Sequence, residues 1–357
     1  MKAALIGIGQ AGGKVAQALR DADRQAGYDA VRGVLAVNTA RTDLESLSVD
    51  TMLIGQERVE GHGVGADNEL GASIMQADVG EVMGALDGVV DPATEAIVVV
   101  AGLGGGTGSG GAPVLVRELQ RVYEIPVYAV GVLPGGEEGA IYQANAGRSL
   151  KTLVREADSL LLIDNDAWRT SGESVAESFD AINETIARRF GLLLAAGEAV
   201  EGVGEAVVDS SEVINTLRGG GMSAIGYASA EAAPDAGENV NVITSTTRRA
   251  LMTGMSVPET RTADAALVVV AGDPERVPRK GVERARRWVE EQTESMQVRG
   301  GDFPLQSDRI AVVVVLAGIS RSDRLQTFMQ RAREANEEVE REDPATAFDN
   351  DEIDGLF

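Results

Sequence analysis

Short apolar runs alternate with stretches of helical periodicity along the first half of the chain. Residues 3–8 (AALIGI), 96–101 (AIVVVA) and 159–164 (SLLLID) are almost continuously apolar, which is typical of strands covered on both faces of a parallel sheet. Between such runs, apolar residues recur three or four positions apart, as at Val15 and Leu19, which indicates helices. The alternation predicts an α/β fold in which helices cover a parallel sheet.

A long amphipathic helix separates this half from the rest. Its stripe predicts a helix over 174–198 that is buried for much of its length, and the stripe consists of Val175, Phe179, Ile182, Ile186, Leu193 and Leu194. Beyond it the pattern predicts a smaller α+β domain with a mixed sheet, built from strands at 266–271, 297–305 and 310–316 and helices at 241–253, 282–296 and 322–340. We therefore expect a first domain at 1–172, a connecting helix at 173–200, an α+β domain at 201–321, and a terminal helix with an acidic tail at 322–357.

Glycine-rich turns follow two of the predicted strands. GQAGG occupies 9–13, and GGGTGSGG occupies 104–111, between an apolar strand and a segment that can open a helix. Such a turn offers backbone N–H groups beside the positive end of a helix dipole, which suits an oligophosphate. A flexible linker is disfavoured because linkers do not usually join a buried strand directly to a helix. We expect a nucleotide site here, in which Thr107 and Ser109 supply hydroxyls for phosphate or Mg²⁺.

The first turn also satisfies the dinucleotide pattern GxGxxG, at 7–12. A dinucleotide enzyme needs a carboxylate at the end of its second strand, but here that strand (34–37) ends in Asn38-Thr39-Ala40. The other common phosphate loop, GxxxxGK[ST], is absent. An NAD-dependent oxidoreductase is therefore disfavoured.

Composition narrows the function further. The formal charge of −24, from 56 acidic against 32 basic residues, argues against binding to nucleic acid or an anionic membrane. There is no apolar run of roughly 18 residues, and the start of the chain reads as a strand rather than a signal peptide. We therefore expect a soluble intracellular protein with no direct membrane insertion. The absence of cysteine and the single histidine, His62, exclude disulfides and zinc-thiolate sites and disfavour histidine-based catalysis.

Lysine is nearly absent, occurring only at Lys2, Lys14, Lys151 and Lys280. Excess acid with little lysine suits a protein in molar salt, where screening over about 3 Å removes the self-repulsion of such a charge. The composition indicates a halophilic archaeal source; the alternative is an ordinary acidic cytosolic protein, which would usually keep more lysine.

The order and content of the loops resemble those of the tubulin/FtsZ superfamily. GGGTGSGG resembles its signature loop, and matching stretches run from residue 7 to residue 226. GQAGG, DNDAW at 164–168 and the acid-rich composition are most similar to the CetZ group of haloarchaeal tubulin-like proteins. The resemblance implies a tubulin/FtsZ fold with a Rossmann-like GTPase domain, GTP or GDP and Mg²⁺ as ligands, and a cytoplasmic, cytoskeletal protein that assembles head to tail into filaments and controls cell shape. A nucleotide-binding regulator that does not polymerise and an FtsZ-type division-ring protein are the alternatives.

The resemblance also assigns nucleotide contacts to this sequence. They are Gly9, Gln10, Ala11, Gly12, Gly13, Lys14, Asn38, Gly65, Ala66, Asp67, Gly104, Gly105, Gly106, Thr107, Gly108, Ser109, Glu138, Asn165, Phe179 and Asn183. Gln10 and Asp67 would reach the metal ion, Asp67 through water. Asp67 is equally well placed to be the N-cap of the following helix.

The ribose and the base have their own expected partners. Glu138 matches the family's ribose ligand, and Asn165 and Asn183 would pair with guanine because an amide presents a donor and an acceptor together. Phe179 would stack on the base, with a plain core position as the alternative. Tyr142 stands where FtsZ has an arginine, so an FtsZ-like arginine contact to phosphate is not expected.

Two carboxylates, Asp209 and Glu212, open a predicted helix at i and i+3 and so share one face. The resemblance implies that they enter the nucleotide site of a neighbouring subunit and orient the attacking water. The alternative is a helix cap without chemistry.

The chain ends in an acidic tail. From Glu334 onward acids outnumber the single basic Arg341, and Asp343-Pro344 breaks any helix, so we expect a mobile segment. Its last residues, 353–357 (IDGLF), are either a docking peptide for a partner protein or a solvated end.

Overall fold

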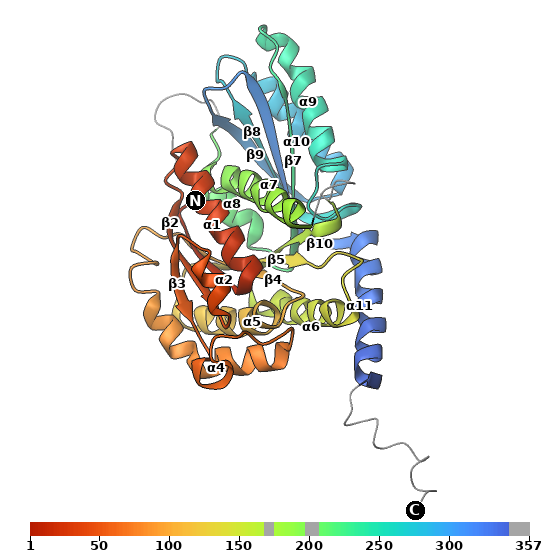
Figure 1. The fold of residues 1–357 in the computed structure, drawn as a ribbon. Coiled ribbons are helices and arrows are strands. Elements are labelled where there is room, and N and C mark those ends of the chain that lie inside the picture. Colours follow the sequence, from red (N-terminus) through yellow and green to blue (C-terminus); the bar gives the residue numbers. More distant parts are fainter. Residues whose placement is uncertain (168–174, 197–206, 343–357) are drawn as a thin grey trace, which may run out of the picture.

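The computed structural model describes residues 1–167, 175–196 and 207–342. One ten-stranded sheet runs through it in the order β3-β2-β1-β4-β5-β6-β7-β10-β8-β9, with helices on both faces (Figure 1). The predicted α/β fold with a parallel sheet, a long central helix and an α+β second half is confirmed. The tail after residue 342, expected to be mobile, lies outside the described residues.

The first half forms the parallel part of the sheet. Its strands pair in parallel throughout and are β1 (Ala3–Ile8), β2 (Val31–Asn38), β3 (Asp50–Leu53), β4 (Ala96–Gly102), β5 (Val127–Leu133) and β6 (Ser159–Asp164). The connecting helices are α1 (Gly9–Ala26), α2 (Arg41–Glu45), α3 (Gln56–Val59), α4 (Asn68–Ala85), α5 (Gly106–Val122) and α6 (Ala140–Glu156), and a 3₁₀ turn, η1 (Asn165–Ala167), follows β6. The short elements β3, α2 and α3 were not predicted, because they are too short to show a period.

The second half joins this sheet through a narrow junction. β7 (Met222–Glu231) pairs in parallel with β6 at only two positions, Leu160↔Met222 and Leu161↔Ser223. Antiparallel pairing then links β7 to β10 (Arg309–Ser322) and β10 to β8 (Thr260–Gly272), while β9 (Gln297–Pro304) runs parallel to β8. The mixed sheet was expected, but it continues the first sheet instead of standing apart.

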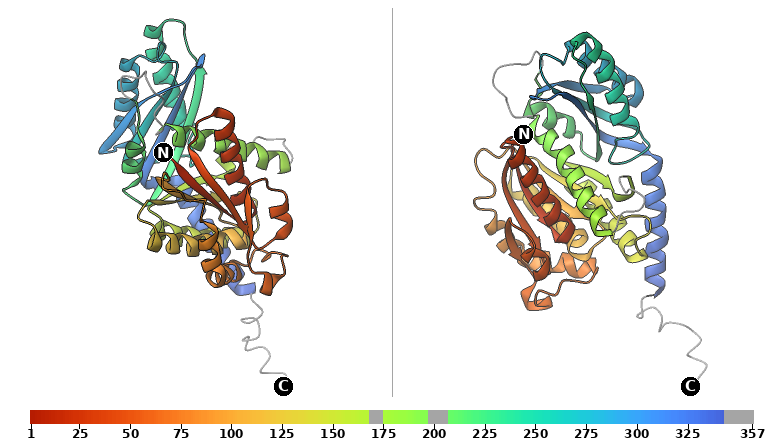
Figure 2. Two further views of the ribbon diagram at one scale, coloured as in Figure 1. Left: turned by 90° about the vertical axis from the view of Figure 1, so that its left-hand side faces the viewer. Right: turned by 45° about the horizontal axis from the view of Figure 1, so that its top comes forward.

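Helices of the second half cover both faces. They are α7 (Val175–Ala195), α8 (Ser210–Leu217), α9 (Ala236–Met252), α10 (Arg279–Thr293) and α11 (Asp323–Glu342). α7 packs beside α1, and α11 packs beside α6 of the first half (Figures 1 and 2). α9 starts before the predicted residue 241 because Asp235 accepts a hydrogen bond from the Gly237 N–H and caps it.

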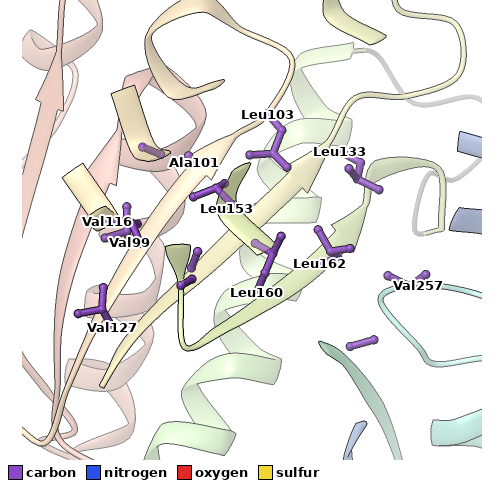
Figure 3. Packing of buried hydrophobic residues seen from close by; sticks show 14 of the residues in the cluster. Val99, Ala101, Leu103, Val116, Val127, Leu133, Leu153, Leu160, Leu162 and Val257 are labelled. Atoms are coloured by element: carbon purple, nitrogen blue, oxygen red, sulfur yellow. The ribbon is translucent and has the colours of Figure 1, made fainter. Parts of the chain in front are cut away.

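Each face of the sheet has its own hydrophobic core. On the face of α4, α5 and α6, buried side chains of alternate strand positions pack against the helices, as shown for Val99, Ala101, Leu160 and Leu162 in Figure 3. The opposite face packs against α1 and α7. Strands covered on both faces explain the continuous apolar runs of the sequence. In the part of the chain described above, no helix is both long and apolar enough to span a membrane.

Candidate nucleotide site

A cleft of about 530 Å³ lies at the carboxyl ends of β1, β4 and β5, the edge at which open parallel sheets bind ligands. The structure brings most of the predicted residues to its wall: Gly9, Gln10, Ala11, Lys14, Asn38, Gly65, Ala66, Gly104, Gly105, Gly106, Thr107, Gly108, Glu138, Asn165 and Asn183. Turns that are far apart in the sequence thus form one cavity.

Two helices present free N-termini to this cleft. α1 starts at Gly9 and α5 at Gly106; neither has a side-chain cap or an acidic residue in its first turn. The first N–H groups of a helix have no intrahelical partner, and the helix dipole adds positive potential there. The cleft is therefore suited to an oligophosphate even though Lys14 is the only lysine on its wall.

Gly106 and Gly108 of the second turn are required by close packing. A Cβ at Gly106 would lie 2.6 Å from Val64 Cγ2 and 2.8 Å from the Asp67 backbone N, and one at Gly108 would lie 2.5 Å from the Gly102 carbonyl oxygen. At Gly105 a Cβ would meet nothing within 4 Å. The turn thus packs tightly on the protein side while Gly105 faces open space.

Asn145, which the sequence analysis did not identify, holds together the turn at Gly65–Ala66 and the turn at Gly104–Gly106 (the phosphate turns). It is fully buried on α6, and its Nδ2 donates to the Ala66 carbonyl at 2.7 Å and to the Gly104 carbonyl at 3.0 Å. A hydroxyl pair, Thr39 and Thr107 at 2.7 Å, links β2 to the same region. Asn145 belongs to no motif, so only the fold reveals its position.

Asp43, also not predicted, supplies a carboxylate to the cleft wall. It accepts hydrogen bonds from Gln10 Nε2 at 3.1 Å and from Asn38 Nδ2 at 2.9 Å. Among the described residues, no three His, Asp or Glu side chains form a ready-made metal site. A cation here would therefore need the oxygens of a bound phosphate as ligands as well.

The far end of the cleft carries the side chains expected for ribose and base. Glu138 Oε1 accepts the Gly135 N–H at 2.7 Å, and Gln143 donates to the Gly135 carbonyl at 2.6 Å, which fixes the turn. Asn165 is 7% exposed, and its Oδ1 accepts no hydrogen bond from the described residues. A buried oxygen without a donor is costly, so a ligand donor is well accommodated at this position.

Several predicted contacts are not on the wall. Ser109 is buried, and its hydroxyl donates to the Gly105 carbonyl because α5 begins at Gly106, earlier than expected. Gly12 and Gly13 lie within α1 and pack against its neighbours; a Cβ at Gly12 would lie 2.2 Å from the Val100 carbonyl oxygen. Asp67 is exposed beside the cleft and caps α4 through the Leu70 N–H at 2.9 Å. The side chain of Phe179 lies outside the described residues.

A larger cavity of about 970 Å³ lies between α1, α7 and the second half, and it shares Lys14 and Asn183 with the nucleotide cleft. Asn183, near the middle of α7, therefore forms part of both walls.

Asp209 and Glu212 lie at the other, amino-terminal end of the parallel strands, where Ser210 between them bonds to Glu95, the residue before β4. Asp209 caps α8 by accepting the Glu212 N–H at 2.9 Å and the Ser211 hydroxyl at 2.6 Å, so the capping role is present. The Ser211 hydroxyl, followed by the Glu212 N–H, lowers the pKa of Asp209. Partial burial, followed by the nearby charge of Asp209, raises the pKa of Glu212.

Comparison with known proteins identifies the fold. Residues 2–172 match the family model described as Tubulin/FtsZ family, GTPase domain, and residues 172–334 match that described as Tubulin-like CetZ, C-terminal domain. The sequence is 64% identical over 360 residues to tubulin-like protein CetZ2 of Haloferax volcanii, with 100% of each chain covered. The chain belongs to the tubulin-like CetZ family.

Solved CetZ structures are similar throughout. The structure described as CetZ2 from Haloferax volcanii, GTPγS bound protofilament, matches with a TM-score of 0.92 and 64% identity over 95% of this chain and 100% of that one. CetZ1 from the same organism, described as a GDP bound monomer, matches with a TM-score of 0.87 and 50% identity over 94% and 99%. The chain therefore carries the GTPase domain of the tubulin/FtsZ family, followed by the CetZ C-terminal domain.

Proposed function

We propose that this CetZ-family chain binds GTP in the cleft, assembles head to tail into filaments, and hydrolyses the nucleotide at the junction between copies. The observation that carries the proposal is that the cleft and the pair Asp209 and Glu212 lie at opposite ends of the parallel strands. The relative described as a GTPγS bound protofilament, 64% identical, supports the same arrangement.

The cleft suits a guanine nucleotide. The starts of α1 and α5 would bind the phosphates, and Glu138 would bind the ribose. Asn165 and Asn183 both line the cleft, and the free Asn165 oxygen matches the N1–H and 2-amino donors of guanine. Adenine has no such pair of donors, so the cleft should prefer GTP.

The donors at the phosphate end also fit Mg²⁺. This ion is usually held by one or two carboxylates together with phosphate oxygens and several waters. Asp43 on the wall, Gln10 bonded to it and Asp67 beside the cleft provide such oxygens, and we propose that Gln10 and, through water, Asp67 serve the ion. When bound, Mg²⁺ would neutralise charge that builds up during phosphoryl transfer.

Asp209 and Glu212 are not among the residues that line the cleft of their own chain. Asp209 and Glu212 are separated from it by the length of the strands, roughly 20 Å for a strand of this size, so they cannot act on nucleotide bound in their own chain. When two copies stack by translation, Asp209 and Glu212 of one copy would face the phosphates bound in the cleft of the other. There they would position the attacking water. A head-to-tail contact of this kind does not close and so propagates as a filament.

In the cell such filaments would form part of the cytoplasmic cytoskeleton and control cell shape, with residues 353–357 as a docking peptide for a partner protein.

Light scattering and phosphate release, measured together in molar salt after adding GTP and Mg²⁺, test the proposal. Scattering and turnover should rise together above a threshold protein concentration. GTP binding without any rise in scattering would favour a regulator that does not polymerise.

A further inference from the structure

An arginine of the last helix joins the carboxylates on either side of Asn165. Arg324, at the start of α11, donates through Nε to Asp164 and through Nη2 to Asp164 Oδ1 at 3.1 Å and to Asp166 Oδ2 at 2.7 Å. Asp164 is the last residue of β6 and is 1% exposed, so its charge depends on this arginine rather than on water. These hydrogen bonds raise the pKa of Arg324 above its ordinary value, which keeps the guanidinium charged.

The turn that carries Asn165 is closed by the same carboxylates. The Asp166 N–H donates to Asp164 Oδ1 at 3.1 Å, so the Asp164 side chain caps the backbone across Asn165. Arg324 therefore fixes both ends of a three-residue segment whose middle side chain lies on the cleft wall with an unsatisfied oxygen.

The ribose side of the cleft rests on the same helix. Asp166 Oδ2 also accepts the Gly136 N–H at 2.9 Å, which ties the turn before Glu138 to the Arg324 cluster. A Cβ at Gly136 would lie 2.3 Å from Arg331 Nη1, so the guanidinium of Arg331, from α11, packs directly on the backbone of this turn. Two walls of the cleft thus depend on one helix from the end of the chain.

α11 is firmly attached to the first half of the chain. Arg148 of α6 donates to Asn336 Oδ1 at 2.9 Å, and Gly147 lets Ala332 approach so closely that a Cβ there would lie 2.7 Å from the Ala332 Cβ. The two helices meet at the side of the molecule in Figure 1. The position of Arg324 is therefore set by helix packing and not by a free side chain.

We propose that Arg324 is a positioning residue for the base: through Asp164 and Asp166 it holds Asn165 where the amide oxygen accepts hydrogen bonds from guanine. The proposal rests on the proposed function, since it requires a guanine nucleotide in the cleft. It makes recognition of the base depend on a residue 160 positions from Asp164 in the sequence, whereas the phosphate contacts of α1 and α5 are independent of it.

The test compares GTP with inosine triphosphate, which lacks the 2-amino group of guanine. Dissociation constants for both are measured by calorimetry in molar salt, below the assembly threshold, for the wild type, Arg324→Met and Arg324→Lys.

Arg333→Met is the matched control, because Arg333 is exposed on the same helix. Loss of one well-aligned hydrogen bond corresponds to about tenfold in binding, so both Arg324 variants should reduce the GTP preference about tenfold. Affinity for inosine triphosphate should change far less, and the control should match the wild type.

Folding must be separated from positioning. Lysine keeps a positive charge beside Asp164 but lacks the planar fork that joins two carboxylates, so Arg324→Lys decides the matter if Arg324→Met is unfolded by circular dichroism. An unchanged GTP preference in a folded Arg324 variant, or an equal loss for both nucleotides, would overturn the inference. Absence of GTP binding by the wild type would instead overturn the proposed function.

Discussion

The Ser210 hydroxyl donates to Glu95 Oε1 at 2.7 Å and so fixes the first turn of α8 to the amino edge of the sheet. Glu95 directly precedes β4, and its N–H donates to the Lys2 carbonyl at the start of β1. The Met1 amino group bonds to the Leu194 carbonyl, which places the end of α7 at the same edge. Since the cleft lies at the other end of these strands, the cleft and the Asp209–Glu212 pair lie at opposite ends of the sheet.

Substitutions at Asp209 separate the cap from the proposed chemistry. Asparagine is as good an N-cap as aspartate, so Asp209→Asn should keep the wild-type melting temperature. Asp209→Ala should lose about 1 kcal/mol of stability. Both should bind GTP normally, lose most turnover and leave longer-lived polymers. Thermal melts and phosphate release measured on the same samples check this. Wild-type turnover in Asp209→Asn would show that Asp209 caps the helix and has no part in hydrolysis.

The folded protein should be more stable when the Glu212 carboxyl group is neutral. Burial and the charge of Asp209 raise the pKa of Glu212 in the folded state. Its contribution to the free energy of unfolding is therefore favourable below the unfolded-state pKa of about 4.3, and is lost as the pH rises through the folded-state pKa. Glu212→Gln should therefore melt above the wild type at neutral pH, and the difference should shrink as pH falls toward about 4. Turnover should nevertheless drop. A melting temperature below that of the wild type at neutral pH would contradict the assignment.

Asn145→Ala should loosen the phosphate turns. It leaves the Ala66 and Gly104 carbonyls without their donor, which should cost about 2 kcal/mol of stability and weaken GTP binding about tenfold. Ser149→Ala is the control, because Ser149 is buried on the same helix and its hydroxyl has no partner among the described residues. Equal GTP affinities in the two variants would show that the tie is dispensable.

Adjacent glycines of the signature turn should respond differently to a methyl group. Gly106→Ala places a Cβ against the Asp67 backbone and should destabilise the fold by roughly 1–3 kcal/mol. Gly105→Ala meets open space and should leave stability unchanged. Chemical denaturation of both variants measures the contrast, and similar unfolding midpoints would argue against the close packing.

The sequence predicted the fold well because strands covered on both faces and amphipathic helices leave strong patterns. It could not predict Asn145 or Asp43, which act through long-range contacts and belong to no motif. Ser109 illustrates the opposite case: its motif suggested a phosphate contact, but the early start of α5 turns its hydroxyl toward the Gly105 carbonyl. Gly106 and Gly108 pack closely against their neighbours in this first turn of α5, which the sequence does not show.

The position of Asp209 shows how a local reading can be correct yet incomplete. Its helix cap was one of two interpretations, and the structure contains that cap. Only the arrangement of the strands reveals that Asp209 lies away from the cleft of its own chain. The proposed catalytic role therefore remains a prediction.

A mixing experiment tests the division of the site between two copies most directly. One variant, Asp209→Asn with Glu212→Gln, keeps the cleft; the other, Gly105→Asp, keeps the acids but places a carboxylate in the open space of the phosphate turn. Each alone should hydrolyse GTP poorly, whereas an equimolar mixture should recover turnover, because one copy supplies the nucleotide and the other supplies the acids. A mixture that stays inactive although both variants are folded and assemble together, or a double variant that hydrolyses GTP at the wild-type rate alone, would contradict the account.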